Sequence, residues 1–173
     1  MTEPEPARGG GALARFAAAY AALLRGLLVA SVAVIVVPVT LQIVSRFTAL
    51  IPHYIWTEEL ARFLLVWMVM IGAILAVREG THFTVDVFPV LPPRREAALR
   101  LLVGAASLVF AFVFLWWGWE FTETAIHRTS ELAELPLWTI HVAWPIAGAS
   151  FLLFLAVQMA ADLRALRGGG PPA

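Results

Sequence analysis

The chain contains no cysteine and no lysine, and it has few charged residues of either sign. Without cysteine it has no disulfide, no thiolate metal ligand and no cysteine nucleophile. Its formal net charge of zero argues against nucleic acid as a partner. Only 14% of the 173 residues are charged, whereas 61% are hydrophobic, and the mean hydropathy is +0.83. A soluble domain of this size could not bury so much apolar surface, so the composition predicts a membrane protein.

Motifs for catalysis or for a bound group are also missing. The sequence has no nucleophile elbow, no phosphate-binding loop and no zinc motif, so nothing in it predicts an enzyme. The histidines do not recur at a ligand spacing such as H-x-x-H; they are His53, His82, His127 and His141. We therefore expect no haem, no metal and no other cofactor.

Long apolar runs are the main feature that the sequence does have. A helix needs about 20 mostly apolar residues to cross the hydrocarbon core of a bilayer. Four stretches qualify, at about 26–45, 60–77, 101–119 and 138–161. No stretch alternates as a barrel strand does. The predicted fold class is therefore an all-α membrane protein, with four transmembrane helices in domain 26–161 and short interfacial segments.

The flanking segments and the arginines predict the orientation. Residues 1–25 are expected to form a cytoplasmic tail, in which 12–25 either lies on the membrane surface or extends the first span, and 162–173 a second tail. Three arginines fall on one side of the predicted spans: Arg46, Arg62 and Arg128. Nine fall on the other side: Arg8, Arg15, Arg25, Arg78, Arg94, Arg95, Arg100, Arg164 and Arg167. The positive-inside rule then places both termini in the cytoplasm.

Charge is scarce inside the spans. The first, third and fourth spans have no Asp, Glu or Arg in their interior, and the second has only Arg62, within a turn of its outer end. Ion-coupled carriers usually keep ionisable groups at membrane depth. No internal repeat is visible, although inverted repeats are common in transporters that work alone. Both absences favour a supporting role over a transport path.

Polar clusters lie at the two ends of the second span. At its start, Glu58 and Glu59 are four and three residues before Arg62, a spacing that places them on neighbouring helix positions. Either the cluster pairs with Arg46 or with a charged group on a partner subunit, or the two acids simply favour a helix N-terminus. Both interpretations stay open.

At the other end of this span, Arg78, Glu79, His82 and Asp86 form a second cluster, near a cytoplasmic boundary where arginine is common. Gly72 and Ala76, like Ala143 and Ala147, are small residues four apart that let helices approach closely. Pro145 cannot donate a backbone hydrogen bond, so we expect a kink in the fourth span.

These residues together resemble the small permease subunit of the TRAP (tripartite ATP-independent periplasmic) transporters, the DctQ-like family. The resemblance covers most of the chain from about residue 26. It rests on Arg46-Phe47, Trp56-Thr-Glu-Glu-Leu-Ala-Arg62, Val66-Trp67, Gly72-Ala73, Ala76-Val77-Arg78, His82, Val85, Asp86, Leu135-Pro-Leu-Trp138 and Trp144-Pro-Ile. Phe83 departs from it, since an aliphatic residue is more usual there.

The resemblance implies a division of labour in the bacterial inner membrane. A periplasmic solute-binding protein captures an organic acid such as a dicarboxylate or another carboxylate. A large, DctM-like membrane subunit carries the acid in with sodium, and the small subunit stabilises the large one as a fixed scaffold. The residues implied at subunit interfaces or in structural polar contacts, and not in substrate binding, are Arg46, Trp56, Glu58, Glu59, Arg62, Arg78, His82 and Asp86.

Two other functions were weighed from the residues. One is a self-contained four-helix transporter acting as a homo-oligomer, although such exporters depend on an acid within a span and no span interior here has one. The other is a membrane redox subunit that binds haem or quinone. The sequence does not identify the transported solute. It also does not show which charged residues contact other residues of this chain and which contact a partner subunit.

Overall fold

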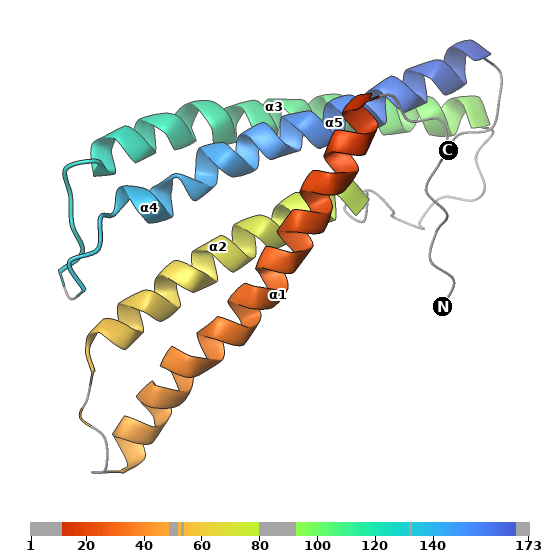
Figure 1. Cartoon of the computed structure of the whole chain (residues 1–173). Coiled ribbons are helices and arrows are strands. Elements are labelled where there is room, and N and C mark those ends of the chain that lie inside the picture. Colours follow the sequence, from red (N-terminus) through yellow and green to blue (C-terminus); the bar gives the residue numbers. More distant parts are fainter. Residues whose placement is uncertain (1–11, 49–51, 53, 80–92, 132, 169–173) are drawn as a thin grey trace, which may run out of the picture.

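The computed structural model describes residues 12–48, 52, 54–79, 93–131 and 133–168 (Figure 1). Its helices are α1 (Ala12–Phe47), α2 (Trp56–Glu79), α3 (Pro93–Ala125), α4 (Trp138–His141) and α5 (Ala143–Gly168). Four described helical segments are long and apolar enough to cross a membrane: Ala12–Phe47, Trp56–Glu79, Leu102–Ala125 and Trp138–Leu163. The predicted all-α class with four membrane helices is confirmed.

α1 is one uninterrupted helix of 36 residues. At about 1.5 Å per residue it is roughly 54 Å long, well beyond a hydrocarbon core of about 30 Å. Residues 12–25 are the first turns of this helix, so they continue the predicted first span and are not a separate helix. The inward face of α1 follows intervals of four and three residues, the spacing of a coiled-coil seam: Ala17, Ala21, Leu24, Leu28, Ser31, Ile35 and Pro38.

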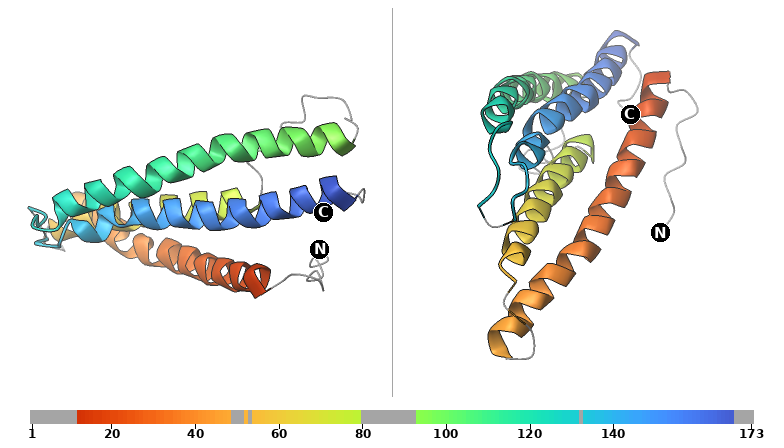
Figure 2. Two further views of the ribbon diagram at one scale, coloured as in Figure 1. Left: turned by 90° about the horizontal axis from the view of Figure 1, so that it is seen from above. Right: turned by 60° about the vertical axis from the view of Figure 1, so that its left-hand side comes forward.

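The helices pack as two pairs joined along one seam. α1 packs on α2, α3 packs on α5, and α2 also packs on α5 (Figures 1 and 2). α1 meets α5 only lightly, and over the described residues α3 meets neither α1 nor α2. The shared core lies where the pairs meet: Met70, Ile71, Ile74 and Leu75 of α2, Phe151, Phe154 and Leu155 of α5, and the first turns of α1.

Glycine allows α3 and α5 to lie very close together. A Cβ added at Gly148 of α5 would lie 2.5 Å from the backbone N of Leu115 and 2.9 Å from the carbonyl O of Ala111. A Cβ at Gly118 of α3 would lie 2.9 Å from the backbone N of Pro145. Real side chains do not reach such distances, so this helix pair depends on both glycines.

The fourth membrane segment is interrupted where the proline predicts an irregularity. α4 ends at His141, and α5 begins at Ala143, two residues before Pro145. Trp67 of α2 donates its indole N–H to the carbonyl of Thr139 over 3.1 Å, at the level of this break. The irregular segment is therefore bonded to the second span.

The two ends of the bundle are named here for use below. α1 ends, α2 begins, α3 ends and α4 begins at the Glu59 end. α1 and α3 begin, and α2 and α5 end, at the Glu79 end.

Candidate functional site

Glu59, in the first turn of α2, is a buried acid that bonds to a distant segment of the chain. Its side chain is only 7% exposed. One carboxylate oxygen, Oε2, accepts a hydrogen bond from the Ser130 hydroxyl at 2.7 Å and another from the backbone N–H of Ala133 at 2.6 Å. Hydrogen bonds to an ionised group are short and strong, and the positive end of the helix dipole favours an acid at this position.

The described residues of the segment that Glu59 contacts, 128–131 and 133–137, form a narrow turn, called here the 128–137 turn. The Ser130 N–H donates to the Leu135 carbonyl at 2.8 Å, and the Leu137 N–H donates to the Arg128 carbonyl at 2.9 Å. The Ser130 hydroxyl also accepts from the Leu135 N–H at 3.2 Å. Glu134 has a φ of 52°, in the left-handed region that the reversal of the chain requires. Glu59 thus fixes the α3–α4 connection to the start of α2.

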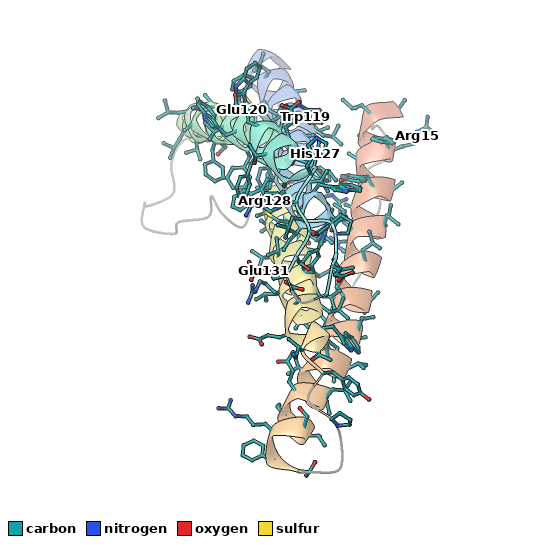
Figure 3. All side chains as sticks on the ribbon, turned by 90° about the vertical axis from the view of Figure 1, so that its left-hand side faces the viewer. Arg15, Trp119, Glu120, His127, Arg128 and Glu131 are labelled. Carbon is teal, nitrogen blue, oxygen red and sulfur yellow. The ribbon has the colours of Figure 1, made fainter. Side chains whose placement is uncertain are left out.

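The other predicted residues of this end point away from the core. Arg46, Trp56, Glu58 and Arg62 are all exposed. Within the described chain no ion pair joins Glu58 or Glu59 to Arg46 or Arg62; the salt bridge of the described residues, Arg25–Glu79, lies at the opposite end. The interpretation in which this cluster pairs internally with Arg46 therefore does not match the structure; Glu59 bonds to the 128–137 turn instead. Figure 3, seen from this end, shows further exposed side chains: Trp119 and Glu120 on the last turns of α3, and His127, Arg128 and Glu131 in the connection that follows it.

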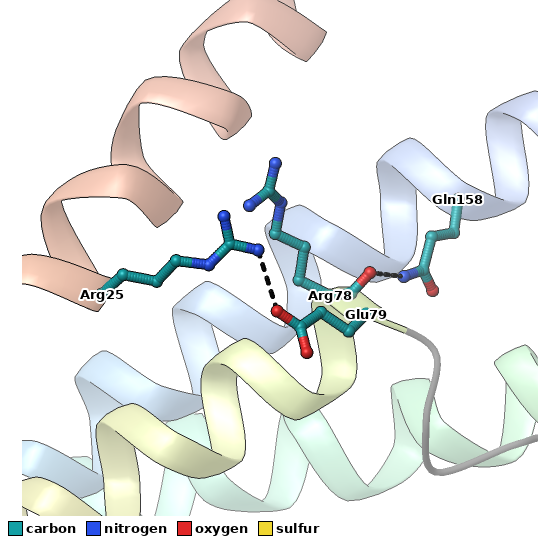
Figure 4. Close-up of polar contacts among 4 residues, drawn as sticks. All are labelled: Arg25, Arg78, Glu79 and Gln158. Carbon is teal, nitrogen blue, oxygen red and sulfur yellow. Dashed lines mark hydrogen bonds and ion pairs between the residues drawn. The ribbon is translucent and has the colours of Figure 1, made fainter. Parts of the chain in front are cut away.

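The Glu79 end is held by contacts from α1 and from α5 to the last turn of α2 (Figure 4). Arg25 of α1 forms a 2.8 Å salt bridge with Glu79, with side-chain exposures of 55% and 47%. Gln158 of α5 donates from Nε2 to the carbonyls of Val77 and Arg78, both at 2.9 Å. Because the last carbonyls of a helix have no partner within it, Gln158 acts as a cap supplied by a neighbouring helix.

Two predicted residues of this end, His82 and Asp86, lie outside the described residues. Arg78 is half-buried, and its backbone carbonyl is the atom that contacts α5. The structure therefore connects Arg78 to the fourth membrane segment through the main chain.

A third polar contact lies between the first turns of α1 and the middle of α5. The Ser150 hydroxyl donates to the Ile146 carbonyl at 2.7 Å, so the 2.8 Å contact between Tyr20 and Ser150 has the tyrosine as donor. The Tyr20 ring also stacks on Phe154 at 6.0 Å between centroids. This contact fixes the extra N-terminal turns of α1 against α5.

Sequence reasoning missed Ser130, Tyr20, Ser150 and Gln158. For Ser150 and Gln158 a signal was present, because a polar side chain within an apolar span often bonds to a neighbouring helix. Nothing in the sequence marks Ser130 among the polar residues of its loop. No group of three His, Asp or Glu residues within the described chain is placed to hold a metal.

A family model and several individual relatives all match this chain to one protein family. The family model described as "Tripartite ATP-independent periplasmic transporters, DctQ component" matches residues 35–165. The chain is 34% identical over 112 residues to the C4-dicarboxylate TRAP transporter small permease protein DctQ of Rhodobacter capsulatus, covering 62% of this chain and 48% of that protein. It is 26% identical over 129 residues to the sialic acid TRAP transporter small permease protein SiaQ of Vibrio cholerae, covering 73% of each.

A further relative carries the same unit within a longer protein. The isethionate TRAP transporter permease protein DctMQ of Oleidesulfovibrio alaskensis is 25% identical over 145 residues, which are 79% of this chain but 23% of that protein. The chain thus spans about half of the Rhodobacter capsulatus protein and less than a quarter of this one. Since the family model covers most of the chain, and four membrane-length helices agree with it, the chain belongs to the DctQ family of TRAP transporter small permease subunits and is a multi-pass membrane protein.

Proposed function

We propose that the chain is the fixed scaffold subunit of a sodium-coupled TRAP importer in the bacterial inner membrane, and that it stabilises a large DctM-like permease subunit. One observation carries the proposal: the polar side chains connect the chain's own helices. Gln158 and Tyr20 each join two membrane segments that are far apart in sequence, and Glu59 joins the second membrane segment to the distant 128–137 turn. A moving transport element would instead need bonds that break and reform, together with ionisable groups at membrane depth.

The partner and solute proposals are supported by the relatives' names. The permease protein DctMQ holds the unit as a minor part of a longer chain, which favours a large membrane partner. Two relatives are named for the carboxylates C4-dicarboxylate and sialic acid, and one for isethionate, a sulfonate. The names favour an organic acid as solute, with a carboxylate in two of the three. We place the choice of solute in the large subunit and in a periplasmic solute-binding protein.

The proposed orientation has both termini in the cytoplasm, following the arginine distribution. The Glu59 end then faces the periplasm, with the exposed 128–137 turn on the side where the solute-binding protein arrives. The Arg25–Glu79 pair lies at the cytoplasmic surface.

The test is co-expression of this chain with the large TRAP permease subunit of the same organism. We expect the two to co-purify, and we expect solute uptake into proteoliposomes only when both subunits, the solute-binding protein and a sodium gradient are present. Uptake by this chain alone would contradict the scaffold function and favour the self-contained transporter. A Soret band in the absorbance spectrum of the purified chain would favour the redox subunit instead.

A further inference from the structure

An apolar groove runs between α2 and α3. Both helices pack on α5, yet over the described residues they do not meet each other. The space between them contains a hollow of about 520 Å³. A second hollow of about 580 Å³ continues along α3, lined by α3 and by Trp144 of α5 and not by α2, and the two hollows share Phe114 and Trp144 in their walls. α5 forms the floor of the groove through Phe151 and Leu155.

Along α3 the two hollows together have the length of a membrane span, whereas α2 forms a wall only of the first, from Val69 to Val77. On α3 the lining of the two hollows extends from Val103 to Thr124, at intervals of four and three residues that form one continuous helix face. These residues span roughly 32 Å of helix, close to the hydrocarbon thickness of about 30 Å. A short ligand would need only part of such a groove, whereas a membrane-spanning segment would fill it from end to end.

The lining is apolar and includes small residues. Ala73 of α2 and Ala106 of α3 line the walls. Gly72 lies beside Ala73, and a Cβ added to it would meet no atom within 4 Å, so the helix surface there is open. Small residues let the backbone of a second helix approach closely, which a lipid tail does not require. A polar solute would find few hydrogen-bonding groups along this path.

Charged groups flank the groove toward the Glu59 end. Arg62 of α2 and Glu120 of α3 are both exposed, and neither forms an ion pair within the described chain. Glu120 lines the second hollow, along α3 and α5, and Arg62 lies two turns from Val69 on the same side of α2. A partner helix that ends in polar groups at this level could interact with one positive and one negative side chain, Arg62 and Glu120.

We propose that the groove between α2 and α3 receives one transmembrane helix of the large permease subunit. This inference rests on the proposed function, in which a large membrane subunit is the partner. The length of the two hollows along α3, the small residues and the flanking charges fit a protein helix, and a relative named as a permease protein matches this chain over only 23% of its own length, which favours a larger membrane polypeptide as the partner.

Two matched phenylalanines on α3 test the position of the partner. Phe110 lines the groove and is 56% exposed, whereas Phe112 lines neither hollow and is 54% exposed. Each is replaced in turn by the photo-crosslinking amino acid p-benzoylphenylalanine, and the chain is co-expressed with the large permease subunit. After irradiation of the membranes, we expect an adduct with the large subunit from position 110 and none from position 112.

A second pair of variants tests the fit of the groove. Ala106→Trp fills it, while Ala105→Trp places the same bulk on the neighbouring residue, outside the lining. We expect Ala106→Trp to recover roughly tenfold less large subunit, because overpacking a contact costs enough to change an equilibrium by that factor. Ala105→Trp should recover the normal amount. Thermal unfolding of each variant alone shows whether its own fold is intact.

The outcomes separate this inference from the proposed function. If the unmodified chain does not bind the large subunit at all, both fail. If the complex forms but position 110 crosslinks only to lipid or to a second copy of this chain, the groove has a different occupant and the inference fails alone. The same conclusion follows if position 112 crosslinks to the large subunit as well as position 110 does.

Discussion

Removing the Glu59 carboxylate should release the 128–137 turn from α2. Glu59→Ala deletes the acceptor of two hydrogen bonds, from Ser130 and from the Ala133 N–H. Hydrogen bonds to charged groups contribute about 1.5–3 kcal/mol each, and a buried donor that loses its acceptor costs about 1–3 kcal/mol. Because the turn can partly rearrange and let water reach both donors, we expect a total loss of about 3 kcal/mol.

The neighbouring acid provides a matched control. Glu58 lies in the same turn of α2 but is exposed, and its side chain makes no hydrogen bond or ion pair within the described residues. Glu58→Ala removes the same charge near the same helix N-terminus, so it accounts for the helix-dipole contribution of about 0.3–1 kcal/mol. Glu59→Gln keeps the shape and one acceptor oxygen but not the charge, and should fall between the two alanine variants.

The measurement is thermal unfolding in detergent, followed by the fluorescence of the seven tryptophans. For a chain of this size, about 3 kcal/mol corresponds to a fall in Tm of roughly 6–12 °C. Limited proteolysis should also cut within the turn of Glu59→Ala, beside the exposed Arg128, faster than in the unmodified protein. Equal Tm values for the Glu58 and Glu59 alanine variants, with unchanged proteolysis, would show that the carboxylate does not hold the turn.

Three further predictions concern the packing and the other end of the bundle. Gly148→Ala should lower the Tm by several degrees, since the new methyl would meet the Leu115 backbone at 2.5 Å, whereas the control Gly72→Ala should leave the Tm unchanged or slightly raised. Equal effects of the two substitutions would show that the packing of α3 on α5 does not depend on close approach. Gln158→Leu should cost about 1–2 kcal/mol by removing the cap from the end of α2, measured by the same unfolding assay, and no loss would mean that water replaces the cap. Arg25→Ala should cost less than about 1 kcal/mol, because the pair with Glu79 is half exposed, and a larger loss at high salt would contradict an exposed ion pair.

The sequence predicts the number of spans but not their lengths. Four apolar runs determine the class, because only a helix can satisfy the backbone of such segments in lipid. The first predicted span, 26–45, is much shorter than α1, because the apolar segment 12–25 contains Arg15 and Arg25 and reads equally well as a surface segment. The position of residues 12–25 against α5 is fixed by the contact between Tyr20 and Ser150, which are 130 residues apart and meet only in the fold.

The roles of the site residues were predictable only in part. Two acids at a helix start were recognised as a polar cluster, but the sequence cannot distinguish Glu58 from Glu59; burial against a turn 71 residues away does so. Small residues were similarly ambiguous. Gly72 faces open space, whereas Ala143 and Ala147 are buried, although both pairs showed the same spacing. Which face of a helix is buried depends on the element that packs against it, and a local sequence pattern does not show that element.

The position of the Glu59 contact has a consequence for the biosynthesis of the chain. α1 and α2 leave the ribosome first, because chains are made from the N-terminus, and domains tend to fold in that order. Glu59 is therefore inserted with its helix long before Ser130 and Ala133 exist, and until then water must solvate its carboxylate at the membrane surface. The contact can form only after the third helix has crossed the membrane and the 128–137 turn has reached the same side. A reversed third helix would leave the acid without its partners, so this one hydrogen-bonded carboxylate reports whether the later helices were inserted in the correct direction.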